Sequence, residues 1–326
     1  MVFWQRLMQK HASMTPRLVP ASTIDPRQRL KAIGLMALAT LCFAVLDSTG
    51  KYLIVKEGVP VAEVTWLRFV GHVVFSAAVL WPFALKPSLR SAKPLVQIFR
   101  SVLMVVTTAF NFIALRYLQL DQTVTIFFLT PLLVAALAGP LLNEWVGWHR
   151  MLAIVAGFFG VLLVMHPGIG TVHWAMLLAL VATFGYALYN LATRYLAAFD
   201  PPSVTQTYTP LAGVLILAPF ALGAWHWPED AHQWVLLASL GFWGGLGHWL
   251  LILAHRSAPA PVLAPFIYLG LIWMSAAGFL VFGDVPTLWT LSGAAIVILS
   301  GLYLLARERK QLGEAKGGPA SDIATQ

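Results

Sequence analysis

The sequence predicts an all-α membrane protein of ten transmembrane helices, arranged as two five-helix units that enter the bilayer in opposite orientations. Three observations predict this fold: the composition, ten long apolar segments, and self-similarity between the two halves. Of 326 residues, 59% are hydrophobic and only 10% are charged, whereas a soluble fold carries about 25% charged residues. A surface so poor in charge is suited to lipid, so the bilayer is the first expected partner.

Ten apolar segments follow one another after residue 31, and a helix needs about 20 such residues to cross a bilayer. The segments cover residues 32–54, 61–85, 95–117, 121–142, 148–166, 173–194, 203–224, 233–254, 259–282 and 287–306. Proline, glycine or charged residues punctuate nearly every gap between them. No apolar segment precedes residue 31, so no cleavable signal peptide is expected.

Lysine and arginine are concentrated in alternate connections, which predicts the orientation. One set includes both tails and the second connection, with Arg100 close by, and the opposite set holds only Lys51, Lys56 and Arg116. Because basic residues stay on the cytoplasmic side, both termini are predicted to be cytoplasmic and the protein to lie in the inner membrane. The same alternation argues against a nucleic-acid partner, despite a net charge of +8, since no continuous basic stripe forms.

The two halves resemble each other at a nearly constant offset. Residues 43–53 align with residues 186–196, and the matched pairs include Ala44/Ala187, Asp47/Asn190, Lys51/Arg194, Tyr52/Tyr195 and Leu53/Leu196. Five helices is an odd number, so the second unit enters the membrane inverted, and such transporters bind their solute near the midplane. We expect the units at 32–168 and 172–306, between a basic N-terminal tail (1–31) and a C-terminal tail (307–326).

Asp47 and Arg68 are the charged residues expected deep within the membrane. A charge at that depth costs several kcal/mol unless it is paired or faces water, so both are candidates for binding the solute or a coupling proton. A direct Asp47–Arg68 ion pair would satisfy both groups, and Lys51, one turn after Asp47, is a competing partner. Such a pair would either fix the helix packing or be broken by a solute or proton during transport.

A second set of candidates consists of aromatic and amide side chains, which face the interior because hydrocarbon offers no hydrogen-bond partner. These candidates are Asn111, Phe128, Tyr186, Tyr189, Asn190, His248 and Tyr268. Together they would line a cavity that stacks a flat or amphipathic solute. The alternative is ordinary interhelical hydrogen bonding and interfacial aromatic belts.

Two prolines lie within apolar segments, Pro131 in the fourth and Pro265 in the ninth. Each removes a backbone hydrogen bond, and each is therefore either a gating hinge or a fixed kink. Glu144 and Asp284 follow the same two segments, and N-capping of the next helix is the favoured interpretation of both.

Several blocks of sequence identify a resemblance. They are FAVLDSTGKYL (43–53), WLRFVG (66–71), FFLTPLLVAALAGPLLNE (127–144), YALYNLATRYL (186–196) and LAPFIYLGLIWMSAAGFLVFGDVPT (263–287). From about residue 32 to 306 the chain resembles EamA-type members of the drug/metabolite transporter superfamily, and its second-half block is similar to the branch containing S-adenosylmethionine and riboflavin importers. Family cavities involve the first, third, fourth, sixth, eighth and ninth helices, which favours Tyr186, Tyr189, Asn190 and Tyr268 as cavity residues.

The resemblance implies a secondary transporter that moves a small organic metabolite across the inner membrane by alternating access. An amphipathic or aromatic solute, similar to S-adenosylmethionine or riboflavin, is the leading expectation, with a proton as a candidate coupling ion. The same motifs occur in exporters of amino acids, metallophores and drugs, so export is the alternative. A homodimer is left open.

An intramembrane enzyme is the competing class of function, and a channel is a third. His72 and His248 stand alone in the sequence, and no His-Glu-x-x-His motif occurs, so neither a metal nor a catalytic role is expected. The single cysteine, Cys42, excludes an internal disulfide and a cysteine metal cage. No repeated filter sequence is present. We therefore expect no enzymatic activity and no cofactor.

Overall fold

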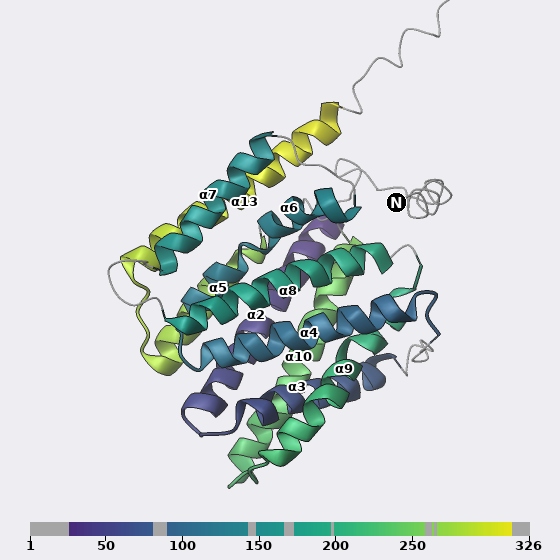
Figure 1. Cartoon of the computed structure of the whole chain (residues 1–326), viewed down its shortest axis with the longest axis vertical. Helices are drawn as coiled ribbons and strands as arrows, with labels where there is room; N and C mark the ends of the chain where they lie inside the picture. Colours follow the sequence, from purple (N-terminus) through teal and green to yellow (C-terminus); the bar gives the residue numbers. More distant parts are fainter. Residues whose placement is uncertain are drawn as a thin grey trace, which may run out of the picture.

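The computed structural model describes residues 26–80, 90–142, 148–165, 173–196, 199–257, 263 and 266–314. The regular structure of these residues is helical, without strands (Figure 1). The first half contains α2 (Pro26–Val55), α3 (Val61–Leu80), α4 (Pro94–Leu115), α5 (Leu120–Phe127), α6 (Thr130–Leu142) and α7 (Trp148–Met165). The second half contains α8 (Trp174–Leu196), α9 (Pro202–Gly223), α10 (Ala231–Ser257), α12 (Leu269–Ala277), the π-helix η3 (Gly278–Phe282) and α13 (Leu288–Glu314).

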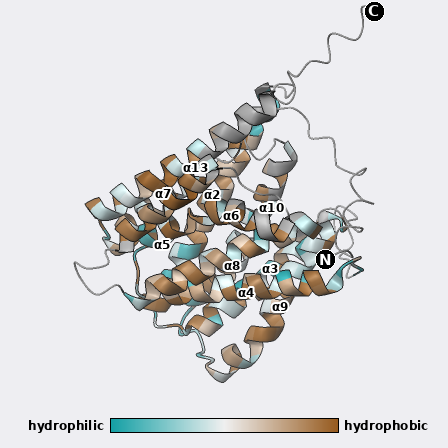
Figure 2. Ribbon diagram, turned by 45° about the horizontal axis from the view of Figure 1, so that its top comes forward, coloured by the Kyte–Doolittle hydropathy of each residue, from teal (hydrophilic) through white to brown (hydrophobic). Residues whose placement is uncertain are grey.

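Six of the described helices are long and apolar enough to cross a membrane: α2, α3, α4, α8, α9 and α10. Shorter apolar helices make up the rest, among them Met151–Val164 of α7 and Leu288–Tyr303 of α13. Hydrophobic residues make up much of the described helices (Figure 2), and many large apolar side chains are exposed, among them Phe159, Leu215 and Leu299 at 60%, 73% and 65%. So large an exposed apolar surface requires a lipid environment.

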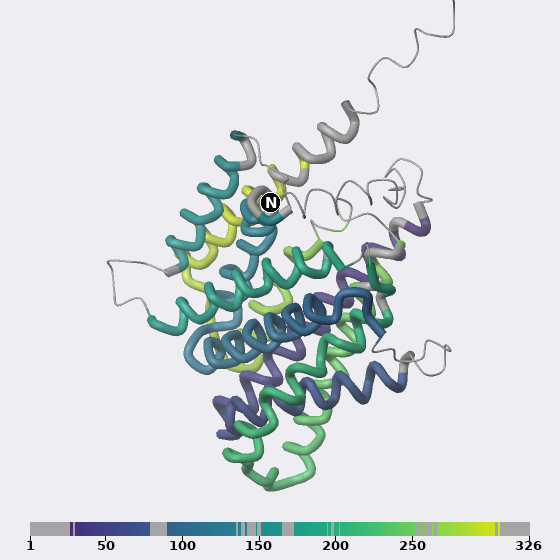
Figure 3. The backbone as a smooth tube through the Cα atoms, turned by 45° about the vertical axis from the view of Figure 1, so that its right-hand side comes forward, coloured from purple at the N-terminus to yellow at the C-terminus, as the bar shows by residue number. Residues whose placement is uncertain are grey.

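The helix contacts repeat between the two halves in the way that a two-fold axis requires. Helix α2 of the first half packs against α10 of the second half. Its counterpart α8, in the second half, packs against α4 of the first half. Likewise α3 contacts α10 while its counterpart α9 contacts α4. The pairs α3–α9 and α7–α13 join equivalent helices, and Figure 3 shows α7 and α13 side by side along one edge. The duplication seen in the sequence is therefore also present in the packing.

Glycines allow two of these contacts to be close. A Cβ atom on Gly241 of α10 would lie 2.2 Å from the Cα atom of Gly71 on α3. A Cβ atom on Gly293 of α13 would lie 2.4 Å from the carbonyl oxygen of Gly160 on α7. Small residues at helix crossings bring the backbones together where lipid offers no hydrophobic driving force.

The fourth apolar segment, expected to be continuous over 121–142, is divided into α5 and α6 at Phe128 and Leu129. Pro131 has no N–H to donate to the carbonyl of Phe127, four residues earlier. The Thr130 hydroxyl donates to that carbonyl instead, at 2.6 Å. Pro131 therefore lies at a real break in the helix, whereas Pro265 lies outside the described residues.

Candidate functional site

The side chains of Asp47 and Arg68 both find partners on α4. Asn111 donates from Nδ2 to Oδ1 of Asp47 at 3.4 Å, and Nη1 of Arg68 donates to Oγ1 of Thr108 at 2.7 Å. Asp47 lies within electrostatic range of the Arg68 guanidinium. In the part of the chain that the structure describes, the two groups make no direct ion pair, and the ion pair that does form joins Lys51 to Asp284. Helix α4 therefore holds both charges apart.

Arg68 is deeply buried, with only 6% of the residue exposed. Its Nε is buried without a hydrogen-bond partner among the described residues. The adjacent helix α10 carries Gly244 at this level, where an added Cβ would lie 3.7 Å from that Nε. A buried N–H without a partner is rare in folded proteins, so Arg68 has a donor available for a ligand.

Tyr186 and Tyr189 on α8 form the aromatic part of the same region. Their rings stack with centroids 5.7 Å apart and an interplanar angle of 11°, and the ring of Phe127 lies 6.0 Å from that of Tyr186. Both tyrosines lie within electrostatic range of the Arg68 guanidinium. Asn190 donates from Nδ2 to the Tyr186 carbonyl of its own helix, at 2.7 Å. Flat solutes stack well on such a pair of parallel rings.

Arg100 on α4 connects the first half of the chain to Tyr189 and two threonines of the second half. Its guanidinium carbon lies 4.2 Å from the centroid of the Tyr189 ring and Nη2 donates to the Tyr189 hydroxyl. It also donates to the hydroxyls of Thr193, at 2.6 Å, and Thr209, at 3.0 Å. In the sequence, Arg100 indicated only the orientation of the chain in the membrane. Its position five residues into an apolar segment was the signal that could have identified it as buried.

His72 and His248, which stand alone in the sequence, are brought together by the fold. Their rings stack at 5.4 Å with an interplanar angle of 12°, and Phe43 meets His248 edge-on at 5.1 Å. Nε2 of Gln206 lies 2.9 Å from Nε2 of His72. The amide can only donate in that contact, so the His72 ring carries its hydrogen on Nδ1. Nε2 of His248 is buried without a partner among the described residues.

Phe128 and Tyr268 contact each other rather than the charged groups. Their rings meet edge-to-face at 4.9 Å. Both belong to an apolar cluster that includes Leu132 and Val297. An added Cβ on Gly301 of α13 would overlap the Tyr268 hydroxyl. These two candidates therefore pack in the contact between α5, α12 and α13.

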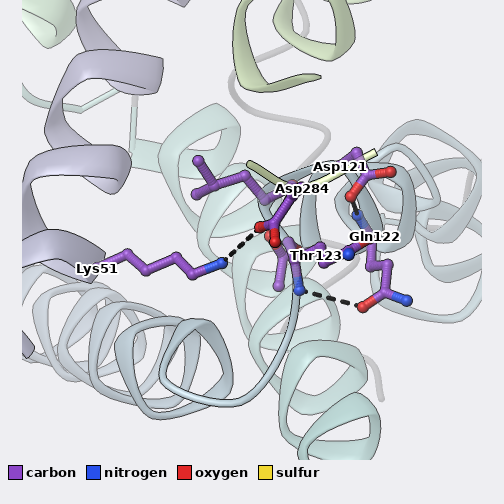
Figure 4. Close-up of polar contacts among 7 residues, drawn as sticks. Lys51, Asp121, Gln122, Thr123 and Asp284 are labelled. Carbon is purple, nitrogen blue, oxygen red and sulfur yellow. Dashed lines mark hydrogen bonds and ion pairs between the residues drawn. The ribbon is translucent and has the colours of Figure 1, made fainter. Parts of the chain in front are cut away.

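Lys51 and Asp284 join the two halves where α2 ends. Lys51 Nζ lies 3.0 Å from Oδ2 of Asp284 and 4.4 Å from the centroid of the Phe282 ring. Figure 4 shows Lys51 extending toward Asp284, beside the start of α5. The N-capping expected of Asp284 is instead provided by Thr287, whose Oγ1 accepts from the Thr290 amide at 3.1 Å. Glu144, the equivalent residue of the first half, lies outside the described residues.

A second polar contact joins the halves where α4 begins. Asp200 accepts from the Ala92 amide and from Nε2 of Gln97, both at 2.8 Å, and from the Ser91 hydroxyl. Burial acts to raise the pKa of Asp200, but these three hydrogen bonds outweigh it and lower that pKa below its ordinary value. The carboxylate therefore stays ionised and holds the connection between α8 and α9 against the start of α4.

Among the described residues, no three His, Cys, Asp or Glu side chains are grouped closely enough to hold a metal ion. The polar and aromatic groups of the site are two guanidinium groups, a stacked tyrosine pair, a stacked histidine pair and one carboxylate. Such groups bind organic solutes through hydrogen bonds, charge and stacking.

Comparison with known proteins agrees with this picture. Residues 30–166 and 173–307 each match the EamA-like transporter family. The "Riboflavin transporter" of Vibrio cholerae is 30% identical over 85% of this chain and 93% of that protein. The "S-adenosylmethionine uptake transporter" of Rickettsia bellii is 27% identical over 86% of this chain and 96% of its own length. A solved structure described as "Crystal structure of protein" has a TM-score of 0.60 at 16% identity, covers 88% of this chain and 98% of its own, and shares the fold.

Proposed function

Because the chain belongs to the EamA-like transporter family, we propose that it is a secondary transporter that carries a small organic metabolite across the inner membrane by alternating access. It spans the bilayer ten times, as two inverted five-helix repeats with both termini in the cytoplasm. The six long apolar helices, the four shorter ones and the two-fold pattern of contacts support this proposal.

The observation that carries the proposal is the meeting of charged and aromatic groups from both repeats. Arg68 and Arg100 come from the first repeat, and Tyr186 and Tyr189 come from the second. A stacked ring pair beside a guanidinium with a free donor suits a flat solute that carries hydrogen-bond acceptors. Riboflavin and S-adenosylmethionine, named in the relatives, both combine a flat ring system with polar groups. Uptake of a solute of this class is therefore the proposed activity.

Coupling to protons is part of the proposal. Asp47 is a carboxylate within electrostatic range of Arg68, and it accepts a long hydrogen bond from Asn111, at 3.4 Å. A carboxylate in this setting is suited to take up a proton when a solute displaces the nearby charge. The Pro131 break beside Phe128 is the proposed hinge in the first repeat.

Uptake by the purified protein in liposomes tests this function. Labelled riboflavin, S-adenosylmethionine and amino acids are offered with and without an inwardly directed proton gradient. We expect saturable uptake of a flat solute that the gradient accelerates. Movement only outward, or only of amino acids, would favour the exporter alternative. A hydrolytic product without solute movement would favour the intramembrane enzyme.

A further inference from the structure

A polar pocket of about 270 Å³ opens beside the Lys51–Asp284 ion pair. It lies beside the C-terminal ends of α2, α4 and η3, and next to the segment that connects η3 to α13. Its charged lining consists of Lys51, Lys56, Arg116 and Asp284. The three basic residues are the same three that the sequence places opposite the cytoplasmic set, so the basic groups of that face converge on one pocket.

The charge of this lining is unbalanced. Three basic side chains face one carboxylate, which leaves a net charge of +2. Asp121 lies nearby at the start of α5 and interacts electrostatically with Lys51 and Asp284, but it is buried and does not line the pocket. Concave sites lined by one sign of charge concentrate counter-ions and speed their association.

Two of the three cations are available to a ligand. Lys51 is engaged by Asp284, whereas neither Lys56 nor Arg116 has a carboxylate partner within the described part of the chain. Arg116 leans over the ring of Tyr117, with its guanidinium carbon 5.7 Å from the ring centroid. The N–H edge of an arginine binds carboxylates and phosphates in a bidentate manner, and a lysine adds a point charge.

We propose that this pocket binds a small oxyanion, the carboxylate or phosphate group of a molecule approaching from the outer face. Lys56 and Arg116 hold the group, and it competes with Asp284 for Lys51. Because Lys51 belongs to the first repeat and Asp284 to the second, occupancy of the pocket weakens the ion pair that joins the repeats at this face. The proposal rests on the proposed function only in assigning the pocket to the outer face.

Direct binding to the full chain tests the proposal without a transport assay. The protein is reconstituted in phosphatidylcholine nanodiscs and titrated with inorganic pyrophosphate at constant ionic strength, followed by phosphorus NMR line broadening. We expect saturable binding that Lys56→Gln and Arg116→Gln each weaken about threefold, as for exposed charges. The double variant should weaken it about tenfold. Lys93→Gln, which removes a cation at the start of α4 packed over the Phe199 ring, serves as the matched control and should leave binding unchanged.

The Asp284→Asn variant tests whether the oxyanion competes with Asp284 for Lys51 or is only attracted by the net positive charge of the pocket. If the oxyanion competes with Asp284 for Lys51, this variant should tighten pyrophosphate binding by more than the threefold that one exposed charge supplies. Equal affinity in the wild type and the Lys56/Arg116 double variant would overturn the site, and unchanged or weaker binding by Asp284→Asn would overturn the competition.

Adding an anionic lipid shows whether the oxyanion is a lipid headgroup or a free solute. Displacement of pyrophosphate by added phosphatidylglycerol, absent in the double variant, would support the oxyanion site with a lipid headgroup as its source. Persistence of binding would support a free solute. The binding experiment is independent of the transport assay. If the wild type transports the solute but does not bind pyrophosphate, the oxyanion site is refuted and the proposed transport function is not.

Discussion

Replacing Arg68 by glutamine should nearly abolish uptake while the protein still folds. The side chain donates to Thr108 at 2.7 Å, and its Nε has no hydrogen-bond partner among the described residues. A hydrogen bond from a charged donor contributes about 1.5–3 kcal/mol. If the solute takes the free donor, its loss corresponds to a decrease of about 10- to 150-fold in the uptake rate at low solute concentration.

The assay compares initial uptake into liposomes with matched amounts of wild type, Arg68→Lys, Arg68→Gln and Thr108→Val. Arg68→Lys keeps the charge but loses the forked donors, so it should fall between wild type and Arg68→Gln. Thr108→Val frees Nη1 but keeps Nε, so it should lower uptake less than Arg68→Gln. Lys93→Gln provides the control for removal of a positive charge elsewhere. Wild-type uptake by Arg68→Gln would refute the placement of the solute beside this guanidinium.

Four further predictions test other parts of the molecule. Asp47→Asn should abolish uptake and remove its dependence on the proton gradient while the protein stays in the membrane, and wild-type uptake by this variant would exclude Asp47 as the coupling group. Lys51→Met and Asp284→Asn should each lower the thermal unfolding temperature, because removing one partner leaves the other charge uncompensated. The double variant should lower this temperature by less than the sum of the two single decreases, and additive decreases would contradict the ion pair's role. The hydrogen bonds that lower the pKa of Asp200 stabilise the folded state. This stabilisation is fully present above the ordinary carboxylate pKa of about 4 and is lost as pH falls through the lower pKa of the folded state. Asp200→Asn should therefore reduce the pH dependence of the unfolding free energy between about pH 5 and pH 2, measured in detergent. Thr130→Val should cost about 1–3 kcal/mol of unfolding free energy, because the Phe127 carbonyl loses its donor, and an unchanged unfolding temperature would show that another donor replaces it.

The sequence predicted the architecture well because lipid imposes simple rules on it. Apolar length, alternating basic connections and a repeated block indicated helices and a duplicated chain, and the helical structure and the match of both halves to one family confirm those two points. The division of the fourth segment was not predicted, although Pro131 was singled out. The break depends on a threonine hydroxyl reaching back to Phe127, and such a local contact is not visible in a hydropathy pattern.

The sequence indicated the residue types of the candidate site but not their pairings, and the role of these residues in transport stays a prediction. Asp47, Tyr186 and Tyr189 lie within electrostatic range of Arg68, and Asn111 of α4 hydrogen-bonds to Asp47. The partners were missed because they come from helices whose relative rotation no sequence pattern specifies. Thr108 is an ordinary helix residue in sequence, yet it receives the Arg68 hydrogen bond.

Two of the polar contacts between the repeats, those of Arg100 and of Lys51, lie toward opposite ends of the bundle, and this placement bears on how the repeats can move. Arg100 and Arg116 are both near the ends of α4, separated by 16 residues, or about 24 Å along a helix. Arg100 bonds Tyr189 and Thr209 of the second repeat near one end, while Lys51 bonds Asp284 near the other. Alternating access needs one end to open while the other stays joined. Under the proposed function, a solute that engages the tyrosine pair would compete with Arg100, and an oxyanion in the pocket beside Lys51 would compete with Asp284. Each end would then have a contact that its own ligand releases, and the order in which the two ligands bind would set the order of the transport steps.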